Sequence, residues 1–140
     1  MSSPELLDEI SRWVRFARED LEGAEALLAD ADFIPRHACW LAQQAAEKAL
    51  KAALVSESVS FPFRHDLDAL RNLLTEGWHV KTEHPDLAEL TEWAVEARYP
   101  GDWPDPTVQD AQRAAAKARA VYESVCAGLI QHGIRLKDAP

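Results

Sequence analysis

Apolar residues recur every three or four positions over most of this chain, the spacing that places side chains on one face of an α-helix. No segment gives a convincing alternation of apolar and polar residues, the pattern of a half-buried strand. The pattern therefore predicts five helices and no strand. The expected helices cover residues 2–30, 35–57, 66–77, 85–98 and 106–129.

Capping residues and prolines mark the ends of these helices. Ser2 is the expected N-cap of the first helix, with Pro4 in its first turn and Glu5 placed to close a capping box. Asp66 is the expected N-cap of the third. The fifth begins at the end of residues 99–106, a stretch whose three prolines disfavour a helix.

The second helix has its apolar and polar residues on opposite faces. Gln44, Glu47, Lys48 and Lys51 share the face where water is expected. Trp40 falls among them, and a large aromatic side chain at a water-facing position indicates a contact surface. We therefore take Trp40 and Gln44 as a dimer face. The opposite, apolar face consists mostly of small residues: Ala38, Leu41, Ala42, Ala45, Ala46, Ala49, Ala52 and Ala53.

Long helices joined by shorter pieces predict an all-α fold, an up-and-down helical bundle of about five helices. The chain has 140 residues, of which 47% are hydrophobic, and this suits one domain with a sizeable core. We expect this domain to cover residues 1–132 and residues 133–140 to form a flexible tail.

The formal net charge is −9. Proteins that bind long nucleic acids usually neutralise phosphates with Lys and Arg, so unaided binding of long nucleic acid is disfavoured.

No window approaches the roughly 18 uncharged apolar residues of a membrane span, and the first residues do not resemble a secretory signal. We therefore expect a cytoplasmic protein without a membrane partner. Cys39 and Cys126 lie apart in helical patterns, which favours buried thiols; a disulfide between them is the alternative.

Two charged residues fall on otherwise apolar helix faces: Asp20 on the first helix and Arg98 on the fourth. A buried charge is costly unless it is paired, so we expect a structural ion pair of Asp20 with Arg98 or with Lys48. In the alternative interpretation, Arg98 binds an anion at the mouth of a cleft. Tyr99 and Trp103 would then stack on a base.

Glu47 and Lys51 are four residues apart on one helix. They form either an ordinary solvated ion pair or, with Trp40 and Gln44, a dimer or ligand face. His65 precedes the expected cap of the third helix and either supports that helix or acts in catalysis.

Two histidines and a carboxylate, His79, His84 and Glu83, lie in an expected loop and are a weak pattern for a metal site. The chain has no glycine-rich phosphate loop, no GxSxG elbow and no His-Glu-x-x-His motif. We predict no metal and no cofactor.

Three short motifs occur in the expected helix order: QQAAEKALK at 43–51, His65-Asp66-Leu67, and Ala97-Arg98-Tyr99-Pro100. Together they resemble the HEPN family, the helical nucleotide-binding domain of higher eukaryotes and prokaryotes, over residues 11–129. The resemblance implies a helical bundle that commonly dimerises and binds nucleotide or RNA. It also implies partnership with a small nucleotidyltransferase in toxin–antitoxin pairs. The nucleotide-binding candidates are Glu47, Lys51, Arg98, Tyr99 and Trp103.

Many ribonucleases of that family carry an Arg followed after four to six residues by His. For Arg98 the matching positions hold Trp103, Pro104 and Asp105, so the catalytic His is absent. Loss of a general acid or base costs orders of magnitude in rate. We therefore predict no catalytic residue, which favours a protein without enzyme activity and leaves the question of an enzyme open. We expect a homodimeric subunit that binds a nucleotide or a nucleotidyltransferase partner.

Two alternatives remain open. One is a divergent metal-independent ribonuclease that uses Arg98 with His65. The other is a helical adaptor whose Trp40 surface docks another protein.

Overall fold

Helices make up all the regular structure of residues 3–61, 65–94 and 104–136, the parts of the chain that the computed structural model describes. The helices in these parts are α1 (Pro4–Leu28), α2 (Pro35–Ser56), α3 (Leu67–Asn72), α4 (His79–Glu83), α5 (Ala88–Thr91) and α6 (Val108–Gln131). The all-α prediction is confirmed, with six helices in the described residues where five were expected.

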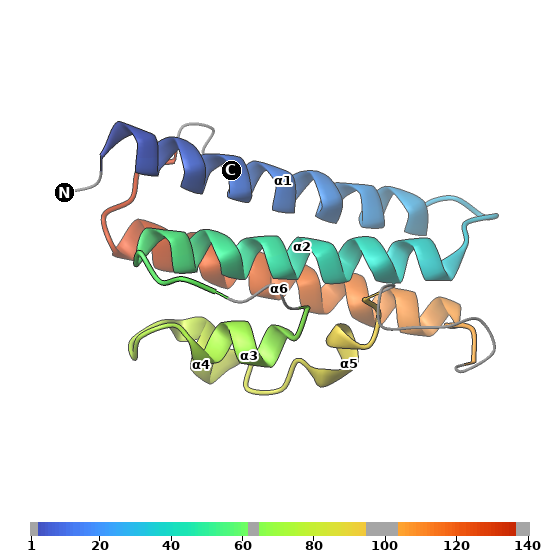
Figure 1. The fold of residues 1–140 in the computed structure, drawn as a ribbon. Coiled ribbons are helices and arrows are strands. Elements are labelled where there is room, and N and C mark those ends of the chain that lie inside the picture. Colours follow the sequence, from blue (N-terminus) through green and yellow to red (C-terminus); the bar gives the residue numbers. More distant parts are fainter. Residues whose placement is uncertain (1–2, 62–64, 95–103, 137–140) are drawn as a thin grey trace.

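The long helices α1, α2 and α6 lie side by side, and the short helices form a further layer along α2 and α6 (Figure 1). Helix α1 runs antiparallel to α2. Helix α6 runs in the same direction as α2, because α3, α4 and α5 bring the chain back to the end where α6 begins (Figure 1). The segment that returns between α2 and α6 therefore contains short helices where a long one could lie.

Local capping explains where two of the long helices begin. Ser3, not Ser2, caps α1: its Oγ accepts a hydrogen bond from Leu6 N at 3.1 Å, and Pro4 follows at the first helical position. The expected box with Glu5 does not form, because the third helical residue is then Leu6. Thr107 caps α6 in a full capping box with Asp110.

The core lies where the small residues of α2 and α6 meet. Residues of α6 spaced three or four apart along one face are buried there: Ala111, Ala114, Ala115, Ala118, Val121, Tyr122, Val125 and Leu129. Beyond α6, Ile134 is also buried, and its N–H donates to Leu129 O. Packing therefore continues past residue 132. Residues 137–140 lie outside the described parts.

The polar side of α2 is not open to water, and this expectation was wrong. Glu47 and Lys51 are buried, while Gln44 and Lys48 are half-buried. Helix α2 packs against α1, α6, α3 and α5, and the segment that includes Phe61 also covers it. Neighbours therefore surround α2 on nearly every side.

The short helices differ most from the prediction. The third helix ends at Asn72 and not near Gly77, whose φ of +102° suits a turn. Of the helix expected over 85–98, the described residues up to 94 contain only α5, since Trp93 and Ala94 already bond three residues back, to Leu90 and Thr91. Helix α4 lies in an expected loop.

Candidate functional site

A buried polar cluster surrounds the carboxylate of Glu47 on α2. The Glu47 side chain is 5% exposed, and three donors reach it. Gln43 Nε2 donates to Oε1 at 3.1 Å, and Lys51 Nζ donates to Oε2 at 2.9 Å. His65 Nδ1 lies 2.9 Å from Oε1. We call these four residues the Glu47 cluster.

Helical spacing and one cap bring the cluster together. Gln43 and Lys51 are one turn before and one turn after Glu47, so all three share a side of α2. His65 comes from the segment before α3, whose start is set by Asp66 Oδ1 accepting from Ala69 N at 3.2 Å. Gln43 Nε2 also donates to His65 O at 3.2 Å. One amide therefore connects α2 to the beginning of α3.

The electrostatics of the cluster favour an ionised carboxylate. Burial raises the pKa of Glu47, but hydrogen bonds from Lys51, His65 and Gln43 outweigh it, so this pKa lies below its ordinary value. The ammonium of Lys51 also lies 5.6 Å from the ring centre of Trp13 and 5.5 Å from that of Phe61. Because its oxygens already accept from three groups, Glu47 is better suited to joining α2 to its neighbours than to taking a proton from a substrate.

Asp20 pairs with Lys48, one of the two partners that the sequence left open. Lys48 Nζ lies 2.5 Å from Asp20 Oδ2 and links α2 to α1. Both side chains are partly exposed, at 26% for Lys48 and 21% for Asp20, so the site is not dry. Arg98, Tyr99 and Trp103 lie outside the described residues.

The expected dimer face is partly used inside the protein. Gln44 Nε2 donates to Gln43 Oε1 at 2.8 Å, so this side chain supports the Glu47 cluster. Trp40 is half-buried, and its Nε1 is enclosed without a hydrogen-bond partner in the described residues.

The other sequence candidates are separate from the cluster. His79 is exposed, and His84 is half-buried. No group of three His, Cys, Asp or Glu side chains in residues 3–61, 65–94 and 104–136 could hold a metal ion.

Cys39 and Cys126 are buried free thiols. Within the same ranges, no helix combines the length and the hydropathy of a bilayer-crossing segment.

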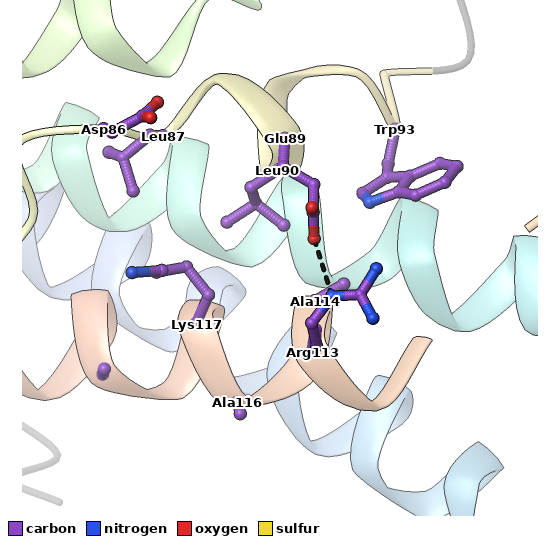
Figure 2. A pocket seen from close by; sticks show the side chains of 10 residues that line it. Asp86, Leu87, Glu89, Leu90, Trp93, Arg113, Ala114, Ala116 and Lys117 are labelled. Atoms are coloured by element: carbon purple, nitrogen blue, oxygen red, sulfur yellow. Dashed lines mark hydrogen bonds and ion pairs between the residues drawn. The ribbon is translucent and has the colours of Figure 1, made fainter. Parts of the chain in front are cut away.

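A pocket that the sequence did not reveal lies between α5 and α6 (Figure 2). Its volume is about 370 Å³. Arg113 spans one side, where its Nε lies 3.1 Å from Glu89 Oε1. The lining residues are Asp86, Leu87, Glu89, Leu90, Trp93, Arg113, Ala114, Ala116, Lys117 and Ala120.

Spacing within each helix was the one signal for this pocket. Glu89 and Trp93 are four residues apart, as are Arg113 and Lys117. The first pair comes from α5 and the turn after it, and the second comes from α6. The pattern of one segment does not show which other segment it faces.

Comparisons with known proteins agree with this fold. The family model described as HEPN domain matches residues 10–129. A crystal structure of TT1696 from Thermus thermophilus is 27% identical, with a TM-score of 0.69 over 84% of this chain and 96% of that one. The structure of ST0689, described as an archaeal HEPN homologue, is 23% identical, with a TM-score of 0.63 over 86% and 98% of the two chains. No curated protein matches the chain.

Proposed function

Starting from the fact that this chain belongs to the HEPN family, we propose that it is a binding subunit without a ribonuclease centre. In this proposal it forms a homodimer and binds a nucleotide or a small nucleotidyltransferase, as one half of a toxin–antitoxin pair.

The observation that carries this proposal is that His65 already has contacts inside the protein. Positions 103–105 hold no His, so a ribonuclease built on Arg98 would need an acid or base from elsewhere in the chain, and His65 is the candidate in the divergent-ribonuclease alternative. His65 Nδ1 is in contact with Glu47 Oε1, and its carbonyl accepts from Gln43. This use of the ring supports a structural role for His65.

The pairing of basic side chains also supports the proposal. Affinity for RNA comes largely from Lys and Arg that are free to neutralise phosphates. In the described residues Lys48 pairs with Asp20, Arg71 with Asp68 and Arg119 with Glu25. Together with the net charge of −9, these pairs leave a surface poorly suited to a long RNA.

An RNA cleavage assay tests the absence of a nuclease. Labelled single-stranded RNA incubated with the purified protein and a metal chelator should stay intact, as it should with His65→Ala. Arg135→Ala, a change at an exposed residue near the end of the chain, is the matched control. Cleavage by the wild type that is lost in Arg98→Ala or His65→Ala, but kept in Arg135→Ala, would show that the divergent ribonuclease is correct.

Two binding measurements test the other half of the proposal. Calorimetry with a panel of nucleotides should give heat that Arg98→Ala reduces. Co-expression with a nucleotidyltransferase from a neighbouring gene should give a complex on gel filtration. If neither measurement detects binding, the adaptor alternative is favoured.

A further inference from the structure

The chain between α4 and α5 is held against α3 through its backbone. Arg71 Nη1 donates to His84 O at 2.9 Å, and Arg71 is itself only 6% exposed. The same guanidinium pairs with Asp68, whose Oδ1 accepts from Leu87 N at 2.9 Å. These bonds fix the course of residues 84–91, which we call the α5 segment.

The side chain of His84 places one ring nitrogen where it has no partner. His84 is half-buried, and its Nδ1 is enclosed without a hydrogen bond to any residue of 3–61, 65–94 and 104–136. An enclosed N–H without an acceptor is costly, so the neutral ring carries its proton on Nε2. A second proton would create an N–H at Nδ1 that nothing there can accept.

Most of the charges that face His84 also oppose a second proton. Lys117 of α6 repels a positive ring, whereas Glu83, which precedes His84 and accepts from Ser124 Oγ at 2.7 Å, attracts one. The guanidinium of Arg71 from α3 is bonded to the His84 carbonyl. Burial first, and then Lys117, lower the pKa of His84 below 6.5 in spite of Glu83.

The α5 segment covers part of the core and one wall of the pocket. Leu87 and Leu90 are 1% and 3% exposed, and both line the pocket against α6 (Figure 2). Thr91 Oγ1 accepts from the N–H of Leu67, where α3 begins, at 3.1 Å. Because α3 begins two residues after the histidine of the Glu47 cluster, release of the α5 segment would alter both the pocket and the support of that cluster.

We propose that the α5 segment is a pH-sensitive switch, closed while His84 is neutral and opened when His84 takes up a proton. In the open form the ring turns to water, where its new N–H is solvated and Lys117 is farther away. Since the closed form has the lowered pKa, it is fully favoured above about pH 6.5 and loses this stabilisation as the pH falls through that pKa. The inference does not depend on the proposed function, because it involves neither a nucleotide nor a partner.

Amide hydrogen exchange followed by NMR at pH 7.5 and pH 5, without any ligand, tests the proposal. The amides of Leu87 and Leu67 report on the α5 segment, since each donates to a side chain across its boundary. After correction for intrinsic exchange rates, both should be open about threefold or more often at pH 5 than at pH 7.5. The amide of Leu50, in the middle of α2, should stay better protected than both, because the bundle remains folded.

Three substitutions assign the change to His84. His84→Gln is neutral at every pH and should remove the difference between the two pH values. His79→Gln, at an exposed histidine of α4, is the matched control and should keep it. Lys117→Gln should reduce it, because loss of the facing charge brings the folded-state pKa of His84 closer to 6.5. Circular dichroism of each variant verifies that the fold is kept.

Three results would overturn the inference. The first is equal opening of the Leu87 amide at pH 7.5 and pH 5. The second is an undiminished pH difference in His84→Gln. The third is equal protection of the Leu87 and Leu50 amides at pH 5, which would mean that the α5 segment opens only when the whole bundle unfolds.

Discussion

At the scale of single residues, the carboxylate of Glu47 is a buried charge that needs hydrogen-bond and ion-pair partners. A buried charge without partners costs several kcal/mol, and here the cost is offset by donors from Gln43, Lys51 and His65. Removing the negative charge would take the ion pair with Glu47 from the ammonium of Lys51, whose side chain is only 10% exposed.

We therefore expect Glu47→Gln to lower the free energy of unfolding by about 3 kcal/mol. The matched control is Glu22→Gln, at a side chain that is 63% exposed and 3.6 Å from Arg18, where the change should stay within about 0.5 kcal/mol. Urea denaturation of the three proteins measures both values. Similar effects of the two substitutions would show that the Glu47 cluster contributes little to stability.

Stability should also depend on pH through His84. Burial, and then the charge of Lys117, lower the pKa of His84 below its ordinary value of 6.5. The unfolded chain then takes up a proton at a higher pH than the folded chain. The contribution of His84 is full above about pH 6.5 and is lost as the pH falls through the folded-state pKa.

Urea denaturation between pH 7.5 and pH 5 should therefore show stability falling with pH, and less steeply in His84→Gln. An identical pH dependence in the variant and the wild type would contradict this prediction.

The sequence could show which of these residues share a helix face. It could not show what covers that face in the folded protein. Glu47 and Lys51 were interpreted as solvated or ligand-facing because they lie opposite the alanine face of α2. They are buried because α1 and the chain around Phe61 and His65 cover that side. A helical projection describes one helix alone, so it cannot show a second covering layer.

At the scale of elements, length decided what could be predicted. Helices α1, α2 and α6 repeat their apolar spacing over six turns or more, and their existence was predicted correctly. Helix α4 has five residues and one buried side chain, Val80, so it shows no repeating spacing of apolar residues. Leu87, Leu90 and Ala94 have the spacing of an apolar helix face and are buried, yet α5 ends at Thr91, since spacing of about three residues suits a tight turn as well as an α-helix.

The approach of α6 to the indole of Trp78 depends on Gly128. A Cβ at this position would lie 2.6 Å from two ring carbons of Trp78, which is 1% exposed and stacked on His132 at 4.5 Å. Gly128→Ala should therefore destabilise the protein by about 1–3 kcal/mol, although Ala normally favours a helix over Gly by about 1 kcal/mol.

Gly23→Ala in α1 is the matched control for that substitution. Its Cβ would meet Leu41 Cδ1 at 3.4 Å, an ordinary contact, so the change should stabilise by about 0.5–1 kcal/mol. Thermal and urea unfolding of both variants measure whether each substitution lowers or raises the free energy of unfolding. Stabilisation by Gly128→Ala would show that Trp78 moves aside easily.

At the scale of the whole molecule, we expect two copies to associate through the surface around Trp40. This side chain is half-buried within one chain, and its enclosed Nε1 has no partner in the described residues. Light scattering should give the mass of a dimer for the wild type and of a monomer for Trp40→Glu.

Phe16→Glu is the control for the dimer measurement. It places the same charge on a 40% exposed aromatic residue of α1, and it should leave the dimer intact. A monomeric wild type at micromolar concentration would show that Trp40 is not a dimer contact.

The central place of α2 has a consequence for how this sequence can change over generations. Fourteen of its 22 residues are buried, against five of the 25 in α1. Most substitutions in α2 change a packed volume or a buried partner, whereas the outer face of α1 can drift with little effect on stability. We therefore expect distant relatives to be recognised mainly through α2, while α1 becomes unrecognisable first.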